Sequence, residues 1–199
     1  MFENESYPLT FKFNITTFHN DFSIIDANGE TRAYVKQKMF KFKEHVRVFT
    51  NESETEIAYD IKADKWIDFN TVYTFFQPNG NSIGSVARKG WRSIWKASYE
   101  LFDENKNQDL LIQEKNPWVR VGDALLCEIP ILGIFTGYLF NPSYTVKRPD
   151  GTLICTFKKA PSFFGRKFEL YKEDEFQQGE EERVKLGLTM MVLLERRRG

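Results

Sequence analysis

The sequence predicts a mainly β protein: a closed barrel of about twelve antiparallel strands around a central hydrophobic C-terminal α-helix. Three observations predict this class. A strand–turn–strand unit recurs three times, further segments alternate apolar and polar residues, and the last segment is apolar on every side. An open two-layer α+β arrangement is the alternative that the same elements could form.

The recurring unit is a β-hairpin whose turn contains Asn-Gly or Asp-Gly. These dipeptides favour the turns that match the twist of paired strands. The spacing between the three turns is unequal, so the repeat is divergent and does not indicate a solenoid. The three units cover Phe22–Lys38, Tyr73–Lys89 and Tyr144–Lys159.

Further strands fill the gaps between the hairpins. In Leu9–Phe18, Phe11, Phe13 and Ile15 share one face and polar residues take the other, which indicates a sheet with one wet face. A strand is expected after the linker that follows each hairpin, and two more strands pair with these. The five segments are Val46–Phe49, Glu56–Ala63, Trp95–Phe102, Leu110–Lys115 and Lys167–Tyr171.

The C-terminal segment predicts a helix over about residues 180–198. Its acidic start and basic end complement the helix dipole. Between Val184 and Leu194 the apolar residues fall all round the helix, so this helix must be enclosed. A barrel wrapped around it provides the enclosure and also removes exposed sheet edges. We expect residues 9–199 to form one domain after a flexible segment at residues 1–8.

Composition excludes several classes of protein. The chain has 199 residues with 28 Lys+Arg and 28 Asp+Glu, and a net charge of zero argues against a surface that binds nucleic acid as a whole. The hydrophobic content of 41% is enough for a sizeable core. Two cysteines cannot form a disulfide scaffold, and the acidic N-terminus is not a secretory signal. These features predict a cytoplasmic protein, with peripheral membrane contact left open.

Two apolar stretches do not satisfy the requirements of a membrane span. Ala124–Phe140 is interrupted by Glu128 and Pro130, and Val184–Leu194 covers only about half of a bilayer core. The sequence therefore predicts no transmembrane span. The role of Ala124–Phe140 stays open among an outer helix, a barrel strand and a docking patch.

The hairpin sequences resemble the plant LURP-one-related proteins. The resemblance rests on Phe22 to Gly29, Tyr34 to Phe40, Val46 to Phe49 and Trp95 to Asn105, and its general pattern extends from Leu9 to Arg198. These proteins share a fold superfamily with tubby-like domains and phospholipid scramblases. The resemblance implies a twelve-stranded barrel around a central helix. It also implies contact with phosphoinositide head groups or membranes, although the Pro-rich arm and Cys-rich acylation cluster of scramblases are absent.

Basic residues recur near the end of each hairpin. They stand seven to nine residues beyond the turn glycine, about 25 Å along a strand. If the hairpins are arranged alike, these side chains gather at the barrel end away from the turns and can bind phosphate groups. The alternative is a solvated strand face with lysine stems lying over aromatic rings. The candidate residues at this spacing are Lys36, Lys38, Arg88, Lys89, Lys158 and Lys159, and Lys41 and Lys43 are further candidates nearby in the sequence.

One segment resembles a calcium-binding EF-hand loop. Oxygen ligands fall at loop positions 1, 3, 5, 7 and 12. Position 6 is Gln108 where the loop needs glycine, and the flanking segments look like strands. A plain hairpin turn, which also prefers Asp and Asn, is therefore the favoured interpretation, and weak calcium binding is the alternative. The ligands would be Asp103, Asn105, Asn107, Asp109 and Glu114.

No pattern in the sequence indicates catalysis. His19 and His45 have no partners at metal-ligand spacing, and neither Cys127 nor Cys155 lies in a nucleophile motif. A glycine-rich phosphate loop and Gly-x-Ser-x-Gly are both missing, so we expect no enzyme and no cofactor.

We therefore expect a noncatalytic binding module that contacts anionic surfaces, with phospholipid head groups as the leading ligand. Its alternative is a protein-interaction or scaffold domain without a lipid role. Scramblase-like lipid remodelling is a weaker alternative, because the short apolar helix would have to leave the barrel and span lipid.

Overall fold

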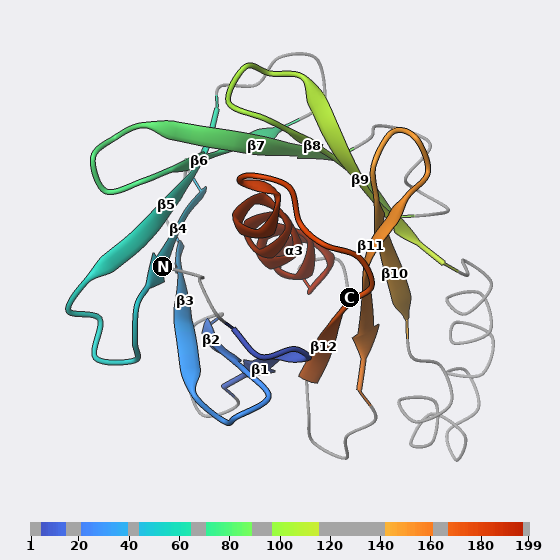
Figure 1. Cartoon of the computed structure of the whole chain (residues 1–199). Helices are drawn as coiled ribbons and strands as arrows, with labels where there is room; N and C mark the ends of the chain where they lie inside the picture. The colour runs from blue at the N-terminus through green and yellow to red at the C-terminus, as the bar shows by residue number, and fades with distance from the viewer. Residues whose placement is uncertain are drawn as a thin grey trace, which may run out of the picture.

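The computed structural model describes residues 5–14, 21–39, 44–64, 71–88, 97–115, 142–160 and 167–196. In these ranges, twelve antiparallel strands form a closed barrel around one helix, α3 (Glu180–Arg196) (Figure 1). The predicted fold class is therefore confirmed. The expectations for Lys41, Lys43, Lys89 and Ala124–Phe140 concern residues outside the described ranges.

The strands follow chain order around the barrel, and β1 pairs with β12 to close it. All neighbouring pairs are antiparallel, so short turns suffice to connect many of them. The strands are β1 (Leu9–Phe13), β2 (Asp21–Ile25), β3 (Thr31–Met39), β4 (Glu44–Phe49), β5 (Ile57–Ala63), β6 (Val72–Phe76), β7 (Ser82–Arg88), β8 (Ser98–Phe102), β9 (Gln108–Glu114), β10 (Ser143–Lys147), β11 (Leu153–Lys159) and β12 (Lys167–Lys172).

The three repeated hairpins share one turn geometry. Gly29, Gly80 and Gly151 have φ values of 85°, 88° and 93°, and each donates its N–H to the carbonyl three residues earlier at 2.9–3.0 Å. The only described non-glycine residues with positive φ are Glu54 and Lys106, so the residue before each glycine is not left-handed. These turns are therefore type I turns followed by a left-handed glycine, and not the two-residue primed turns that Asn-Gly and Asp-Gly favour.

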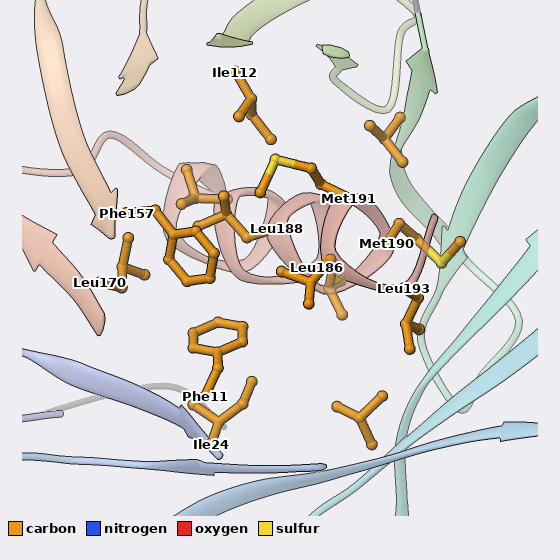
Figure 2. Close-up of a cluster of buried hydrophobic side chains, with 14 of the residues drawn as sticks. Phe11, Ile24, Ile112, Phe157, Leu170, Leu186, Leu188, Met190, Met191 and Leu193 are labelled. Carbon is orange, nitrogen blue, oxygen red and sulfur yellow. The ribbon is translucent and has the colours of Figure 1, made fainter. Parts of the chain in front are cut away.

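The helix fills the inside of the barrel. Leu186, Leu188, Met190, Met191 and Leu193 are at most 1% exposed. Figure 2 shows them surrounded by inward side chains from several strands. Fully burying one such side chain stabilises the fold by about 1.5–3 kcal/mol, so enclosure of the helix is a large part of the core. The strand residues labelled around it are Phe11, Ile24, Ile112, Phe157 and Leu170.

Charged and hydroxyl side chains fasten both ends of α3 to the barrel. At the first turns, Arg148 donates to Glu180 at 2.7 Å and Arg183 donates to Asp109 at 2.7 Å. At the last turn, the hydroxyl of Tyr99 donates to Glu195 at 2.6 Å. These contacts fix the position of the helix along the barrel axis.

No described helix is long and apolar enough to cross a bilayer.

Residues 5–8 belong to the segment that was expected to be flexible. They pack against the end of the barrel that contains the first turns of α3. The N–H of Ala27 donates to the carbonyl of Ser6 at 2.9 Å, and the hydroxyl of Tyr7 donates to Glu181 at 2.7 Å. These contacts tie the segment before β1 both to the first hairpin turn and to α3.

Gly187 allows α3 to lie close to β8. A Cβ atom at this position would stand 2.6 Å from Cδ2 of Leu101, a wholly buried side chain. In an exposed helix, alanine would be more stable than glycine by about 1 kcal/mol. In this helix the overlap with Leu101 must outweigh that gain.

We therefore expect Gly187→Ala to lower the free energy of unfolding by about 1–3 kcal/mol, the cost of overpacking a core. Urea unfolding measures this change. In a Leu101→Ala background the overlap is relieved, so the same substitution should there stabilise the protein. A Gly187→Ala protein that is as stable as the original in both backgrounds would contradict this packing.

The turn carboxylates predict the behaviour of the protein in acid. Hydrogen bonds from the backbone and side chain of Thr152 lower the pKa of Asp150 below its ordinary value of 3.8. Burial alone would raise the pKa of Asp103, but bonds from Asn107 and Asn105 lower it below 3.8. Because the folded pKa values are lowered, their stabilisation is complete above the ordinary pKa and is lost as the pH falls below it.

We expect the free energy of unfolding to fall as the pH decreases below about 4, near the ordinary pKa of aspartate. A variant with Asp103→Asn and Asp150→Asn should show a shallower fall, because asparagine can accept the same bonds without titrating. Urea titrations between pH 6 and 2.5 measure both curves. Parallel curves would show that these two carboxylates do not contribute.

Candidate anion-binding surface

Strand pleating separates the predicted basic residues onto two faces. Lys36 and Lys158 are each the seventh residue after their turn glycine, whereas Arg88 and Lys159 are the eighth. The residues before Lys36 and Lys158 are fully buried in the core. Because successive side chains alternate across a sheet, Lys36 and Lys158 lie on the outer face and the other two positions point inward.

Arg88 serves the helix and not the outer surface. Its guanidinium lies 3.5 Å from the carboxylate of Glu195 and 5.8 Å from the ring centre of Tyr99. Its side chain is only 14% exposed. Lys38 pairs with His45 in the backbone register of β3 and β4. The predicted basic residues that the structure describes therefore do not form one group.

Lys36 and Lys158 lie four strands apart around the barrel, on β3 and β11. Each is surrounded by different neighbours, so the outer face carries two separate groups of cations. Strands β6–β9 lie on the longer way round the barrel from β3 to β11. They contain a single basic residue, Arg88, which points inward. Basic side chains of the described strands are thus confined to one side of the outer face, apart from Lys147 on β10.

The first group, which we call the β3–β5 cluster, is built by strand register. Lys36 is paired with Arg47, and Arg47 with Asp60. His45 is paired with Lys62 one step further along the same two strands. Lateral neighbours on one face of a sheet have side chains within contact distance. The cluster consists of Lys36, His45, Arg47, Asp60 and Lys62.

Asp60 is the only carboxylate in this cluster, and three basic side chains face it. His45 Nε2 lies 2.6 Å from its carboxylate, Arg47 Nε lies 3.5 Å away and Lys62 Nζ lies 3.9 Å away. The Nε–H of Arg47 is buried and has no hydrogen-bond acceptor in the described part of the chain. One carboxylate cannot satisfy all of these donors, so the cluster has capacity for a further anion.

The turn between β4 and β5 supplies a competing carboxylate. Glu54 accepts a bond from Lys36 Nζ at 2.6 Å, and Glu52 accepts one from the hydroxyl of Ser23 at 2.6 Å. The turn therefore leans over the outer face of β2 and β3. An arriving anion would therefore meet Lys36 already paired with Glu54.

The second group, which we call the β11–β1 group, places Lys12, Lys158 and Lys167 around one carboxylate, that of Glu169. Lys158 stacks over the ring of Tyr171 at 5.1 Å, and Lys167 lies 3.0 Å from Glu169. The Tyr171 hydroxyl also donates to Glu169 at 2.7 Å. Bonds from Tyr171 and Lys167 lower the pKa of Glu169 below its ordinary value. Lys12 is paired with Lys167 in the register of β1 and β12.

The calcium-ligand pattern is not assembled in space. Asp103 accepts bonds from the N–H groups of Asn105 and Asn107 at 2.9 and 2.8 Å, which is turn chemistry. Asp109 binds Arg183, and Glu114 lies at the far end of β9, about 16 Å along an extended strand from Asp109. Among the described residues no three His, Cys, Asp or Glu side chains are grouped as metal ligands.

Cys155 lies inside the barrel and is not positioned for chemistry. It is fully buried and forms no disulfide. Burial raises the pKa of its thiol to about 12, with nearby carboxylates adding to the effect. A thiol with this pKa stays protonated at neutral pH and is a poor nucleophile.

Sequence reasoning missed His45, Asp60 and Lys62 as members of the cluster. The available signal was the spacing of polar residues two apart in β4 and β5, which puts them on one face. That signal shows which residues share a face, but the register between strands decides which of them meet.

A twelve-stranded antiparallel barrel closed around a C-terminal helix is the architecture of the tubby-like class. Comparison with family models gave a match to the model described as LURP-one-related over residues 31–126, a range that contains β3–β9. Residues 31–126 are therefore similar to the LURP-one-related family, which belongs to the tubby-like superfamily. Neither the curated proteins nor the solved structures gave a significant match.

Proposed function

We infer that this chain is a noncatalytic binding module whose β3–β5 cluster contacts phosphate groups of anionic phospholipids. The observation that carries this inference is the single Asp60 carboxylate facing His45, Arg47 and Lys62. Arg47 keeps a buried Nε–H without an acceptor among the described residues. Arginine and lysine donors form charge-assisted bonds to phosphate oxygens, which are stronger than neutral hydrogen bonds.

The filled barrel directs ligand binding to the outside. Core positions of α3 such as Leu188 and Met190 are wholly buried, so the interior has no room for a lipid head group. Binding at the outer face would be peripheral and sensitive to salt, because it depends on exposed and half-exposed charges. The cytoplasmic leaflet carries anionic lipids, and each basic residue near such a surface contributes about 1 kcal/mol.

Barrel geometry supplies a matched control for this proposal. The β3–β5 cluster and the β11–β1 group are about a third of the circumference apart. A flat membrane touches only one side of a convex barrel. The two groups therefore cannot both lie against the same bilayer, and the first has four basic side chains where the second has three.

We expect the protein to cosediment with vesicles that contain anionic phospholipid and not with neutral vesicles at low salt. Lys36→Glu with Lys62→Glu should weaken binding about tenfold or more, given about 1 kcal/mol per basic residue. The control, Lys158→Glu with Lys167→Glu, makes the same change in net charge on the other side and should bind nearly as well as the original.

In the Lys36→Glu with Lys62→Glu variant, the salt dependence of binding should also decrease, because fewer cations contact the lipid phosphates. The slope of binding against salt concentration should be shallower for the β3–β5 variant than for the control variant. Equal loss of binding in the two variants would show that binding depends on net charge alone and not on the β3–β5 cluster. Equal binding to neutral and anionic vesicles would contradict the lipid proposal altogether.

One observation favours a second candidate, a protein-interaction or scaffold function. The described strands β6–β9 contribute no cation to the outer face, and Phe102 and Leu111 are half-buried there. Phe76 lies beneath Lys62, whose Nζ is 5.2 Å from the ring centre. A partner could use this side without any lipid role. We do not extend the proposal to lipid remodelling, because α3 would have to abandon its buried contacts and its ionic anchors.

A further inference from the structure

Residues 5–8 occupy the end of the barrel beside the first turns of α3. The Glu5 carboxylate forms an ion pair with Lys185 Nζ, and both side chains are 0% exposed. Lysine and glutamate are almost never fully buried unless they are paired. The pair therefore marks a polar contact site in the barrel end, formed by the helix, the first hairpin turn and Phe176 and occupied by the chain's own segment. We call this site the pocket.

Backbone and side-chain contacts of the kinds that hold a peptide ligand also hold this segment. The N–H of Ala27 donates to the Ser6 carbonyl at 2.9 Å, and the side-chain amide of Asn28 donates to the Ser6 hydroxyl at 3.0 Å. The Tyr7 ring packs against Phe176 with 6.1 Å between ring centres. Its hydroxyl donates to Glu181 at 2.7 Å. Backbone, aromatic and ionic contacts together define a sequence preference.

The ion pair is incompletely satisfied, which makes the segment exchangeable. Glu5 Oε1 is buried and has no hydrogen-bond partner within the described ranges. Burial raises the pKa of Glu5 above its ordinary value despite the attraction of Lys185. The desolvation of a buried ion pair offsets much of its Coulomb energy, so Glu5 holds the segment less tightly than a fully satisfied pair would.

The pocket keeps a partner for its lysine when the segment leaves. Lys185 Nζ also lies 2.9 Å from Glu181, one helical turn earlier. Departure of Glu5 therefore would not leave an unpaired buried cation, which is the costly event in breaking such pairs. Water entering the vacated barrel end would in addition solvate both helix side chains.

We propose that this barrel end is a peptide-binding site for a segment in which a carboxylate residue precedes an aromatic residue by two positions. Residues 5–8 are its built-in competitor, and a segment with the same pattern from another protein chain binds by displacing them. The specificity lies in Lys185 for the carboxylate, in Phe176 for the ring and in Glu181 for a ring hydroxyl. The inference is independent of lipid binding, since it concerns the barrel end and not the outer face.

The test uses a fluorescent peptide with the sequence of residues 1–10 and the full-length chain carrying Glu5→Gln and Tyr7→Ala. These substitutions remove contacts of the built-in segment and change no residue of the pocket. Fluorescence anisotropy should show saturable binding that is at least tenfold tighter than to the original protein, where the segment competes. A peptide with Gln in place of Glu5 should bind at least tenfold more weakly.

Both peptides are also titrated into the original protein, so that the result does not depend on how well the variant folds. The same preference for the Glu5 peptide is expected there at higher concentrations. Absence of saturable binding to both proteins at millimolar peptide would overturn the proposal. Equal affinities of the two peptides would overturn it as well, because the Lys185 pocket would then recognise nothing.

Discussion

The rest of this structure depends on the enclosure of an apolar helix by a closed sheet. Leu186, Leu188 and Met190 belong to a helix that is hydrophobic all round, and only a barrel covers all of its sides. Closure in turn removes every sheet edge. Because the helix fills the interior, the side chains proposed to bind anions lie on the outer face of the strands. The same packing restricts Gly187, since a larger residue would collide with Leu101.

Polar contacts decide how the helix sits within this apolar enclosure. Dispersion and burial alone would tolerate sliding along the barrel axis, whereas Arg148, Arg183 and Glu195 fix the two ends at defined strands. Buried charges of this kind add less to stability than to specificity when their desolvation is counted. At one end, the Glu5–Lys185 pair leaves a carboxylate oxygen unsatisfied among the described residues. This incompletely satisfied end of the barrel is therefore also the best candidate for exchange with a partner.

The sequence predicted the barrel and its helix because both are encoded by local periodicity. Asn-Gly and Asp-Gly turns, alternating strands and an all-round apolar helix each leave a signal within about ten residues. The candidate surface was harder to predict. Basic residues that are adjacent in the sequence, such as Lys158 and Lys159, look like one group, but successive side chains of a strand lie on opposite faces. The cluster around Asp60 needs three strands in register, and no linear pattern records that register. The calcium-like spacing has the same limitation as a signal, since it fits a loop whereas Asp109 and Glu114 lie along an extended strand.

The most direct test of the enclosed helix is native-state hydrogen exchange under increasing denaturant. If helix and barrel form one cooperative unit, the amides of Leu186 to Leu193 should exchange only through global unfolding, with the same opening free energy as the slowest amides of β1, β9 and β11. An opening free energy for the helix well below that of these strands would show that the barrel persists while the helix leaves. That result would contradict the dependence of the barrel on its enclosed helix.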